Sequence, residues 1–197
     1  MRDCEPGVVT EVRDVPHITH VSNIQHRFTG VVVSLVSDTI TINDTTVVRD
    51  VVRHPGAVAV VALRRVDEQW QILMVSQYRH PMQQVCVELP AGLRDIENED
   101  AEDCARRELL EETGYVAGRM EVLLRSATTP GGSDEIITTF WTHDVSWQGV
   151  QQTAEAEELS MSAMWVPLEV AAAAAMTGSL CNQTAQAGIF AVTRKIS

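Results

Sequence analysis

The most constraining feature of this sequence is a set of acidic residues that follows a predicted glycine turn. Glu108, Glu111 and Glu112 are three and four positions apart, and residues with these spacings share one face of an α-helix. Like charges placed this way repel each other and cost the helix about 0.2–0.5 kcal/mol per pair. A hard divalent cation such as Mg²⁺ would offset the repulsion, because it prefers oxygen ligands. The segment therefore predicts a helix that carries a metal site.

The ends of this helix can also be predicted. Asn98 or Asp100 can cap its first turn through a side-chain oxygen. Gly114 is expected at its C-terminal end, where a left-handed backbone conformation is favoured. An apolar stripe should face the core, made by Ala101, Cys104, Ala105 and Leu109.

Length and composition fit one domain with an extension. The chain has 197 residues, of which 45% are hydrophobic, and none of its apolar runs is long enough for a membrane span. Its first residues lack the apolar stretch of a signal peptide. The cysteines show no paired spacing, so we expect reduced thiols and a cytoplasmic location; they are Cys4, Cys86, Cys104 and Cys181.

The formal net charge of −12 bears on possible partners. Nucleic-acid binding needs a basic face, so we expect no nucleic-acid partner. Because bound cations reverse the local charge, a small phosphorylated substrate that binds together with metal remains compatible with this charge.

Strand-like and helix-like segments mix without regular alternation. Residues 28–53 resemble a hairpin or short meander, and residues 57–63 form a continuous apolar run typical of a strand buried on both faces. Further strands are predicted at 70–78, 85–89, 122–127, 136–143 and 159–165, and further helices at 167–178 and 182–194. Residues 145–158 are expected to form an acidic loop. The predicted fold class is α+β, a sandwich around a mixed β-sheet, with residues 1–53 as a β-rich N-terminal extension.

The spacing of charged residues around the helix resembles the Nudix box of the Nudix hydrolases. Six residues separate Gly92 from Glu99, and seven more lead to Arg107 and Glu108. The usual box has five residues after the glycine, so either Glu97 or Glu99 can take the first acidic position. The seven-residue spacing to Arg107 favours Glu99. This resemblance implies a Nudix-like α/β/α sandwich over residues 54–197.

Segments outside the box resemble the ADP-ribose pyrophosphatase branch of that family. They include residues 77–79 and 88–92 before the helix, Pro130 fifteen positions after Tyr115, and residues 165–168. The resemblance implies a Mg²⁺-dependent (or Mn²⁺-dependent) enzyme that hydrolyses ADP-ribose to AMP and ribose 5-phosphate. The alternatives are a UDP- or GDP-sugar pyrophosphatase and a non-catalytic, nucleotide-sensing Nudix module.

The resemblance also implies roles for individual residues. Metal ligation would fall to Glu108, Glu112 and the Ala91 carbonyl, with Glu111 contributing and Arg107 bracing Glu99 or Glu111. The general base would be an acid of the 155–158 loop, with Glu155 or Glu157 favoured and Glu157 also a possible metal ligand. Predicted substrate contacts are Arg79, Glu88, Arg53 and Glu135.

Simpler interpretations of the same residues remain open. Arg107 and Glu111 could be an ordinary ion pair on a solvated helix face. Glu88 could be structural, and Glu135 could be a solvated loop acid. In the resembling branch the N-terminal β segment pairs between subunits, so we expect a homodimer that binds a nucleoside diphosphate sugar, with no membrane partner.

Overall fold

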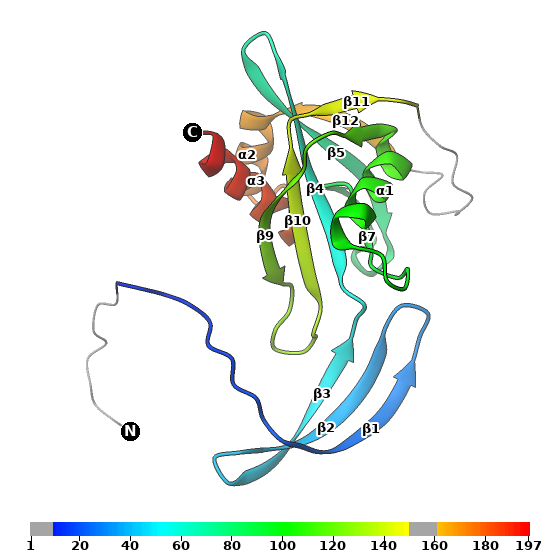
Figure 1. Ribbon diagram of the computed structural model, residues 1–197, viewed down its shortest axis with the longest axis vertical. Helices are drawn as coiled ribbons and strands as arrows, with labels where there is room; N and C mark the ends of the chain where they lie inside the picture. Colours follow the sequence, from blue (N-terminus) through cyan, green and yellow to red (C-terminus); the bar gives the residue numbers. More distant parts are fainter. Residues whose placement is uncertain (1–9, 150–160) are drawn as a thin grey trace.

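The computed structural model describes residues 10–149 and 161–197 (Figure 1). A three-stranded antiparallel sheet, the N-terminal sheet, is formed by β1 (Val21–Thr29), β2 (Ser34–Ile42) and β3 (Thr45–Arg53). Asn43 and Asp44 both have positive φ and make the tight turn between β2 and β3. The predicted meander is therefore present, and it begins at Val21 rather than at residue 28.

The main sheet is mixed, as predicted, and its strand order is β12-β5-β4-β10-β9. β4 (Ala57–Val66) runs parallel to β10 (Ile136–Thr142) and antiparallel to β5 (Gln69–Arg79). The other pairings are antiparallel; they join β9 (Glu121–Ala127) to β10, β12 (Ser162–Pro167) and β6 (Gln84–Glu88) to β5, and β7 (Ala91–Leu93) to β4.

Helices cover both faces of the main sheet (Figure 1). Alternate residues of β4 point to opposite faces, so Ala59 and Val61 pack in one core cluster with α2 (Leu168–Met176) and α3 (Gln183–Ile196). Val58 and Val60 pack in the other with α1 (Ala101–Thr113). The predicted α/β/α sandwich is confirmed, and burial on both faces explains why β4 is a continuous apolar run.

Two short elements were not expected. β8 (Tyr115–Ala117) pairs with β11 (Val145–Trp147), so the predicted loop at 145–158 begins with a strand. Each strand has three residues, too few to show a two-residue period, and the pairing follows from the position of α1. Among the described residues, no helix has the length and apolar character needed to cross a membrane.

Candidate active site

Helix α1 presents its acidic face because its ends and its apolar stripe are fixed. The Asp100 carboxylate accepts a hydrogen bond from the Glu102 N–H at 2.9 Å, so Asp100, not Asn98, is the N-cap. Gly114 ends the helix with φ of 73°, as predicted. Cys104, Ala105 and Leu109 are fully buried against the main sheet, and Glu108 and Glu112 lie on the same side of the helix, where both reach β7.

Arg107 is the centre of the acidic cluster. Its Nε and Nη2 donate to the two carboxylate oxygens of Glu99 at 2.9 and 3.0 Å. Its Nη1 donates to Glu108 at 2.6 Å and to Glu111 at 3.2 Å. The hydrogen bond to Glu99 is the main reason that the pKa of Arg107 is raised and that of Glu99 is lowered. Arg107 thus braces both Glu99 and Glu111, the two carboxylates that its position in the sequence allows it to reach.

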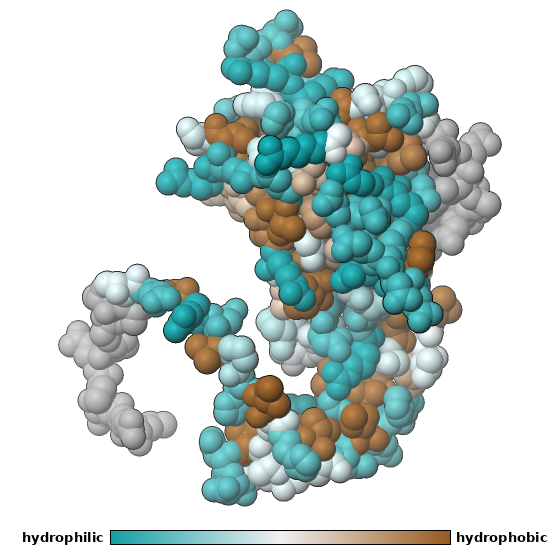
Figure 2. Space-filling view, viewed as in Figure 1, coloured by the Kyte–Doolittle hydropathy of each residue, from teal (hydrophilic) through white to brown (hydrophobic). Residues whose placement is uncertain are grey.

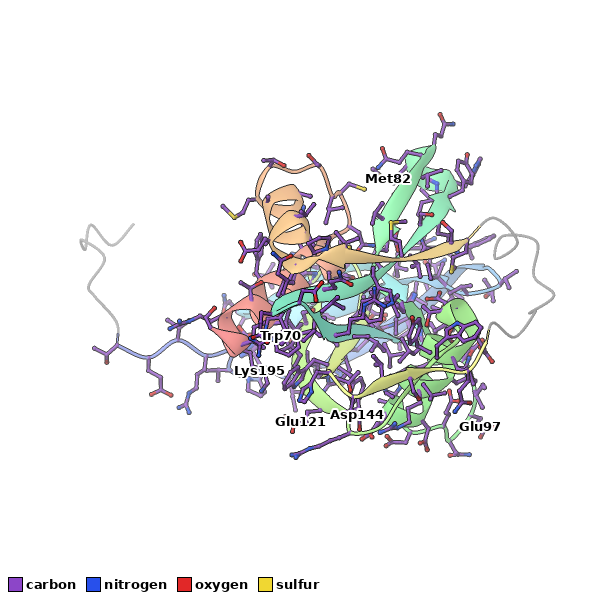
Figure 3. All side chains as sticks on the ribbon, turned by 90° about the horizontal axis from the view of Figure 1, so that it is seen from above. Trp70, Met82, Glu97, Glu121, Asp144 and Lys195 are labelled. Atoms are coloured by element: carbon purple, nitrogen blue, oxygen red, sulfur yellow. The ribbon has the colours of Figure 1, made fainter. Side chains whose placement is uncertain are left out.

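Glu97 does not take the place of Glu99 in this cluster. The Glu97 side chain is exposed and lies at the edge of the molecule near the start of α1 (Figure 3). Glu99 is half-buried and holds both ends of the Arg107 guanidinium. The longer loop after Gly92 is therefore accommodated before Glu99.

Glu108 lies directly over Gly92. A Cβ atom at position 92 would be 1.9 Å from the Glu108 carboxyl carbon, so only glycine leaves room for this carboxylate. Burial raises the pKa of Glu108, although the neighbouring Arg107 opposes the rise. The result is a desolvated carboxylate that a bound cation would stabilise.

Glu112 reaches the same stretch of backbone from the next turn of the helix. Its Oε2 accepts a hydrogen bond from the Ala91 N–H at 3.0 Å. Glu108 and Glu112 therefore converge on the consecutive residues Gly92 and Ala91 at the start of β7.

Ala91 and Gly92 also form part of the wall of a cavity of about 510 Å³. The cavity is bounded by the ends of β5 and β6, by the loop between β9 and β10, and by the start of α3. Met82 lies on its rim, near the tip of the hairpin that joins β5 to β6 (Figure 3). The acidic helix and the cavity thus meet at two shared residues.

Arg79 and Glu88 form a paired cation and anion in this cavity. The guanidinium donates to both Glu88 oxygens, at 3.0 and 2.8 Å. The Glu88 side chain is 5% exposed and that of Arg79 is 41% exposed, so the carboxylate holds the arginine while the arginine still faces solvent. The hydrogen bond to Glu88 raises the pKa of Arg79, which therefore stays cationic.

Glu135 lies on another wall of the cavity in a small hydrogen-bonded group. Its Oε2 accepts from the Thr128 hydroxyl, and its Oε1 is 3.5 Å from His54 Nε2. His54 Nδ1 in turn accepts the Gly56 N–H at 3.0 Å, which ties the His54 ring to the backbone just before β4. Glu135 is thus oriented within the fold rather than left as a loose loop acid.

Arg53 is a predicted substrate contact that the structure does not bring into this cavity. Arg53 binds Asp38 at 2.5 Å and Asp134 at 3.0 Å, where the end of β3 meets the loop before β10. Glu155 and Glu157 lie outside the described residues, as does Glu158.

Whether a divalent metal fits this site depends on the donor atoms near Ala91 and Gly92. Within residues 10–149 and 161–197, no three His, Cys, Asp or Glu side chains are grouped to hold an ion. Two carboxylates nevertheless converge on the consecutive residues Ala91 and Gly92, one of them desolvated, and their donor atoms are oxygens. Such a set suits a hard cation.

Sequence reasoning did not identify two features of the cavity. The Thr128 hydroxyl orients Glu135, and the sulfur atoms of Cys86 and Cys181 lie 3.4 Å apart on the cavity wall. No spacing rule relates residues that are 95 positions apart, so the thiol pair could not be read from the sequence.

Comparison with known proteins agrees with this geometry. The NUDIX domain profile matches residues 53–180. The chain belongs to the Nudix family. It is 40% identical over 146 residues to the ADP-ribose pyrophosphatase of Mycobacterium tuberculosis, covering 74% of this chain and 69% of that protein. It is 41% identical over 120 residues to the ADP-ribose pyrophosphatase of Bacillus subtilis, covering 60% and 63%.

A solved structure confirms the fold of this Nudix protein. The crystal structure of an ADP compounds hydrolase superposes with a TM-score of 0.71 and 17% identity, covering 93% of this chain and 97% of that one. The predicted resemblance to the ADP-ribose pyrophosphatase branch is therefore confirmed, and the chain is a Nudix pyrophosphohydrolase. Nudix hydrolases generally depend on divalent metal ions.

Proposed function

We propose that this protein hydrolyses the pyrophosphate bond of ADP-ribose, or of a related nucleoside diphosphate sugar, in the presence of Mg²⁺ or Mn²⁺. The products from ADP-ribose are AMP and ribose 5-phosphate. One observation carries the proposal: Glu108 and Glu112 contact Gly92 and Ala91, and these two residues line the cavity. A pyrophosphate bound in the cavity would lie against the acidic helix.

The metal site uses Glu108, Glu112 and the Ala91 carbonyl, with Glu111 contributing and Glu157 as a candidate further ligand. A divalent ion there supplies positive charge to the pyrophosphate oxygens and to the attacking water. Arg107 keeps Glu99, Glu108 and Glu111 close together in spite of their mutual repulsion. Arg107 is therefore a positioning residue.

The cavity binds the rest of the substrate. Arg79 can donate two hydrogen bonds to phosphate oxygens, and the nearly buried Glu88 orients it for that contact. Glu135, fixed by Thr128, accepts hydrogen bonds from ribose hydroxyls or the adenine amino group. Arg53 lies outside this cavity, at the junction with the N-terminal sheet, so its contact with substrate would require the substrate to extend beyond the cavity. An acid of the 155–158 loop, Glu155 or Glu157, accepts the proton of the attacking water.

The central test compares Glu112→Gln with the wild type, using ADP-ribose, Mg²⁺ and detection of AMP. The substitution keeps the size of the side chain and removes its charge, so we expect kcat to fall on the order of 100-fold or more. Glu121→Gln on β9 is the matched control, because Glu121 pairs with Arg119 and Lys195 at the surface. Chelation with EDTA should abolish turnover, and added Mg²⁺ should restore it. Unaltered turnover in Glu112→Gln would refute the site.

A substrate panel decides between ADP-ribose and the alternatives. ADP-ribose, UDP-glucose and GDP-mannose should be compared by kcat/KM, since each has the same pyrophosphate and differs in base and sugar. Tight binding of every candidate without any turnover would instead support a nucleotide-sensing module. Hydrolysis in ¹⁸O-labelled water identifies the phosphorus that is attacked, because the label appears in one product.

We also propose that residues 1–53 mediate a homodimer and that residues 54–197 form the hydrolase domain. The N-terminal sheet leaves apolar side chains exposed, as the brown surface in the lower part of Figure 2 shows. They include Val21, Ile24, Phe28 and Val48. A second copy of the chain would cover this surface and protect the edges of the sheet.

A further inference from the structure

Two cysteines from distant parts of the chain meet on the wall of the cavity. Cys86 lies on β6 and is buried, whereas Cys181 is exposed and directly precedes Asn182, the N-cap of α3. Their sulfur atoms are 3.4 Å apart. The contact thus joins the main sheet to the start of the last helix.

Neighbouring groups hold the two thiols in this position. The Gln84 side-chain amide donates to Cys181 Sγ at 2.9 Å and to Cys86 Sγ at 3.5 Å. The Asn182 side chain accepts the Ala185 N–H at 2.8 Å, which fixes the backbone next to Cys181. The thiols therefore meet within ordered structure, which keeps the entropic cost of joining them low.

We propose that Cys86 and Cys181 form a reversible intramolecular disulfide, a redox modification site on the wall of the cavity. A disulfide requires a sulfur separation of about 2.0 Å, which small side-chain rotations can supply from the present contact. The two thiols share this cavity with the proposed substrate contacts, but disulfide formation does not depend on the proposed substrate.

The reaction proceeds by thiol–disulfide exchange with a small disulfide of the glutathione class. The exposed Cys181 thiolate attacks one sulfur of the reagent, forms a mixed disulfide and releases the first small thiol. Cys86 then attacks the Cys181 sulfur and releases the second. The protein dithiol gives up two electrons and two protons, and the small disulfide accepts both.

The third described cysteine provides an internal contrast. Cys104 is fully buried below α1, its thiol donates to the Leu93 carbonyl at 3.4 Å, and burial raises its pKa to about 12. Burial also raises the pKa of Cys86, but Cys86 has the exposed Cys181 as its partner and Cys104 does not. We therefore expect oxidation to select the 86–181 pair.

The disulfide would tie together two walls of the cavity. Cys86 and Glu88 are two positions apart on β6, so they share one face of the strand, and Glu88 holds Arg79. The bridge would close a long loop of chain, so oxidation should raise the Tm on the order of 5–15 °C relative to the reduced protein.

Peptide mapping tests the proposal directly. The full chain is incubated with oxidised glutathione, free thiols are blocked with N-ethylmaleimide, and the protein is digested with trypsin for mass spectrometry. We expect fragment 80–94, which contains Cys86, linked to fragment 126–194, which contains Cys181. Dithiothreitol should restore both free thiols and remove the increase in Tm.

Single variants control for other pairings. Cys181→Ser and Cys86→Ser should each lack the linked fragments and the increase in Tm; Cys181 is exposed, so its variant should fold even if Cys86→Ser does not. Persistence of both as free thiols, a stable mixed disulfide with glutathione alone, or linkage to Cys4 or Cys104 would overturn the proposal. Each readout is independent of hydrolysis, so failure of the proposed function would leave this test intact.

Discussion

Strands β1 and β4 have nearly the same length, nine and ten residues, but very different surroundings. The first seven residues of β4 are buried between α1 on one face of the sheet and α2 with α3 on the other. Every residue of β1 is exposed, including Ile24 at 52% and Phe28 at 63%. The main sheet therefore has a core between its covering helices, whereas β1 contributes no buried residue.

This contrast predicts that truncating a core residue packed against the main sheet costs far more stability than truncating an exposed residue of the N-terminal sheet. Leu109 on α1 is fully buried, so Leu109→Ala should lower the free energy of unfolding by about 2–5 kcal/mol. Val48→Ala on β3 is the control, since Val48 is 56% exposed, and it should change stability by less than about 0.5 kcal/mol. Urea denaturation measures both. Equal losses in the two variants would remove the distinction between the sheets.

The exposed apolar surface of β1 provides a test of the proposed dimer. Ile24→Glu combined with Phe28→Glu places two charges on the apolar surface of β1, so the dimer Kd should rise on the order of 100-fold. Analytical ultracentrifugation measures it, with Val170→Glu on α2 as an exposed control outside the N-terminal sheet. A wild type that stays monomeric at all concentrations would rule out this role.

Gly92→Ala separates activity from stability within the main domain. The added methyl group would occupy the position of the Glu108 carboxylate, and that flexible side chain can move aside. We therefore expect kcat to fall about tenfold or more while the free energy of unfolding falls by less than about 1 kcal/mol. Parallel kinetics and denaturation distinguish this result from global unfolding, in which both quantities would collapse together.

The smallest expected effect concerns acid stability. Arg107 lowers the pKa of Glu99, so the native state binds fewer protons at Glu99 than the unfolded state. This contribution is complete above the ordinary value of 4.5 and is lost as the pH falls through the lowered native pKa. Glu99→Gln should therefore lose less Tm than the wild type between pH 7 and pH 3. A larger loss in the variant would contradict this sign.

The sequence identified the elements whose signals are local. The continuous apolar run of β4 and the Gly114 helix end both follow from short-range backbone and burial rules. The sequence did not predict strands β8 and β11, because a three-residue strand is stabilised by a partner that lies far away in the chain.

By itself, the sequence determined that a helix with Glu108, Glu111 and Glu112 on one face follows a glycine loop, since helical spacing alone brings them together. Only the tertiary structure decided that Arg107 binds Glu99 rather than Glu97, that Glu88 holds Arg79, and that two thiols meet at the cavity. The physical reason is the separation along the chain over which each kind of interaction acts. Helical and strand periodicity fix neighbours within a few residues, whereas packing of the sheet against α1 and α3 brings distant side chains into contact.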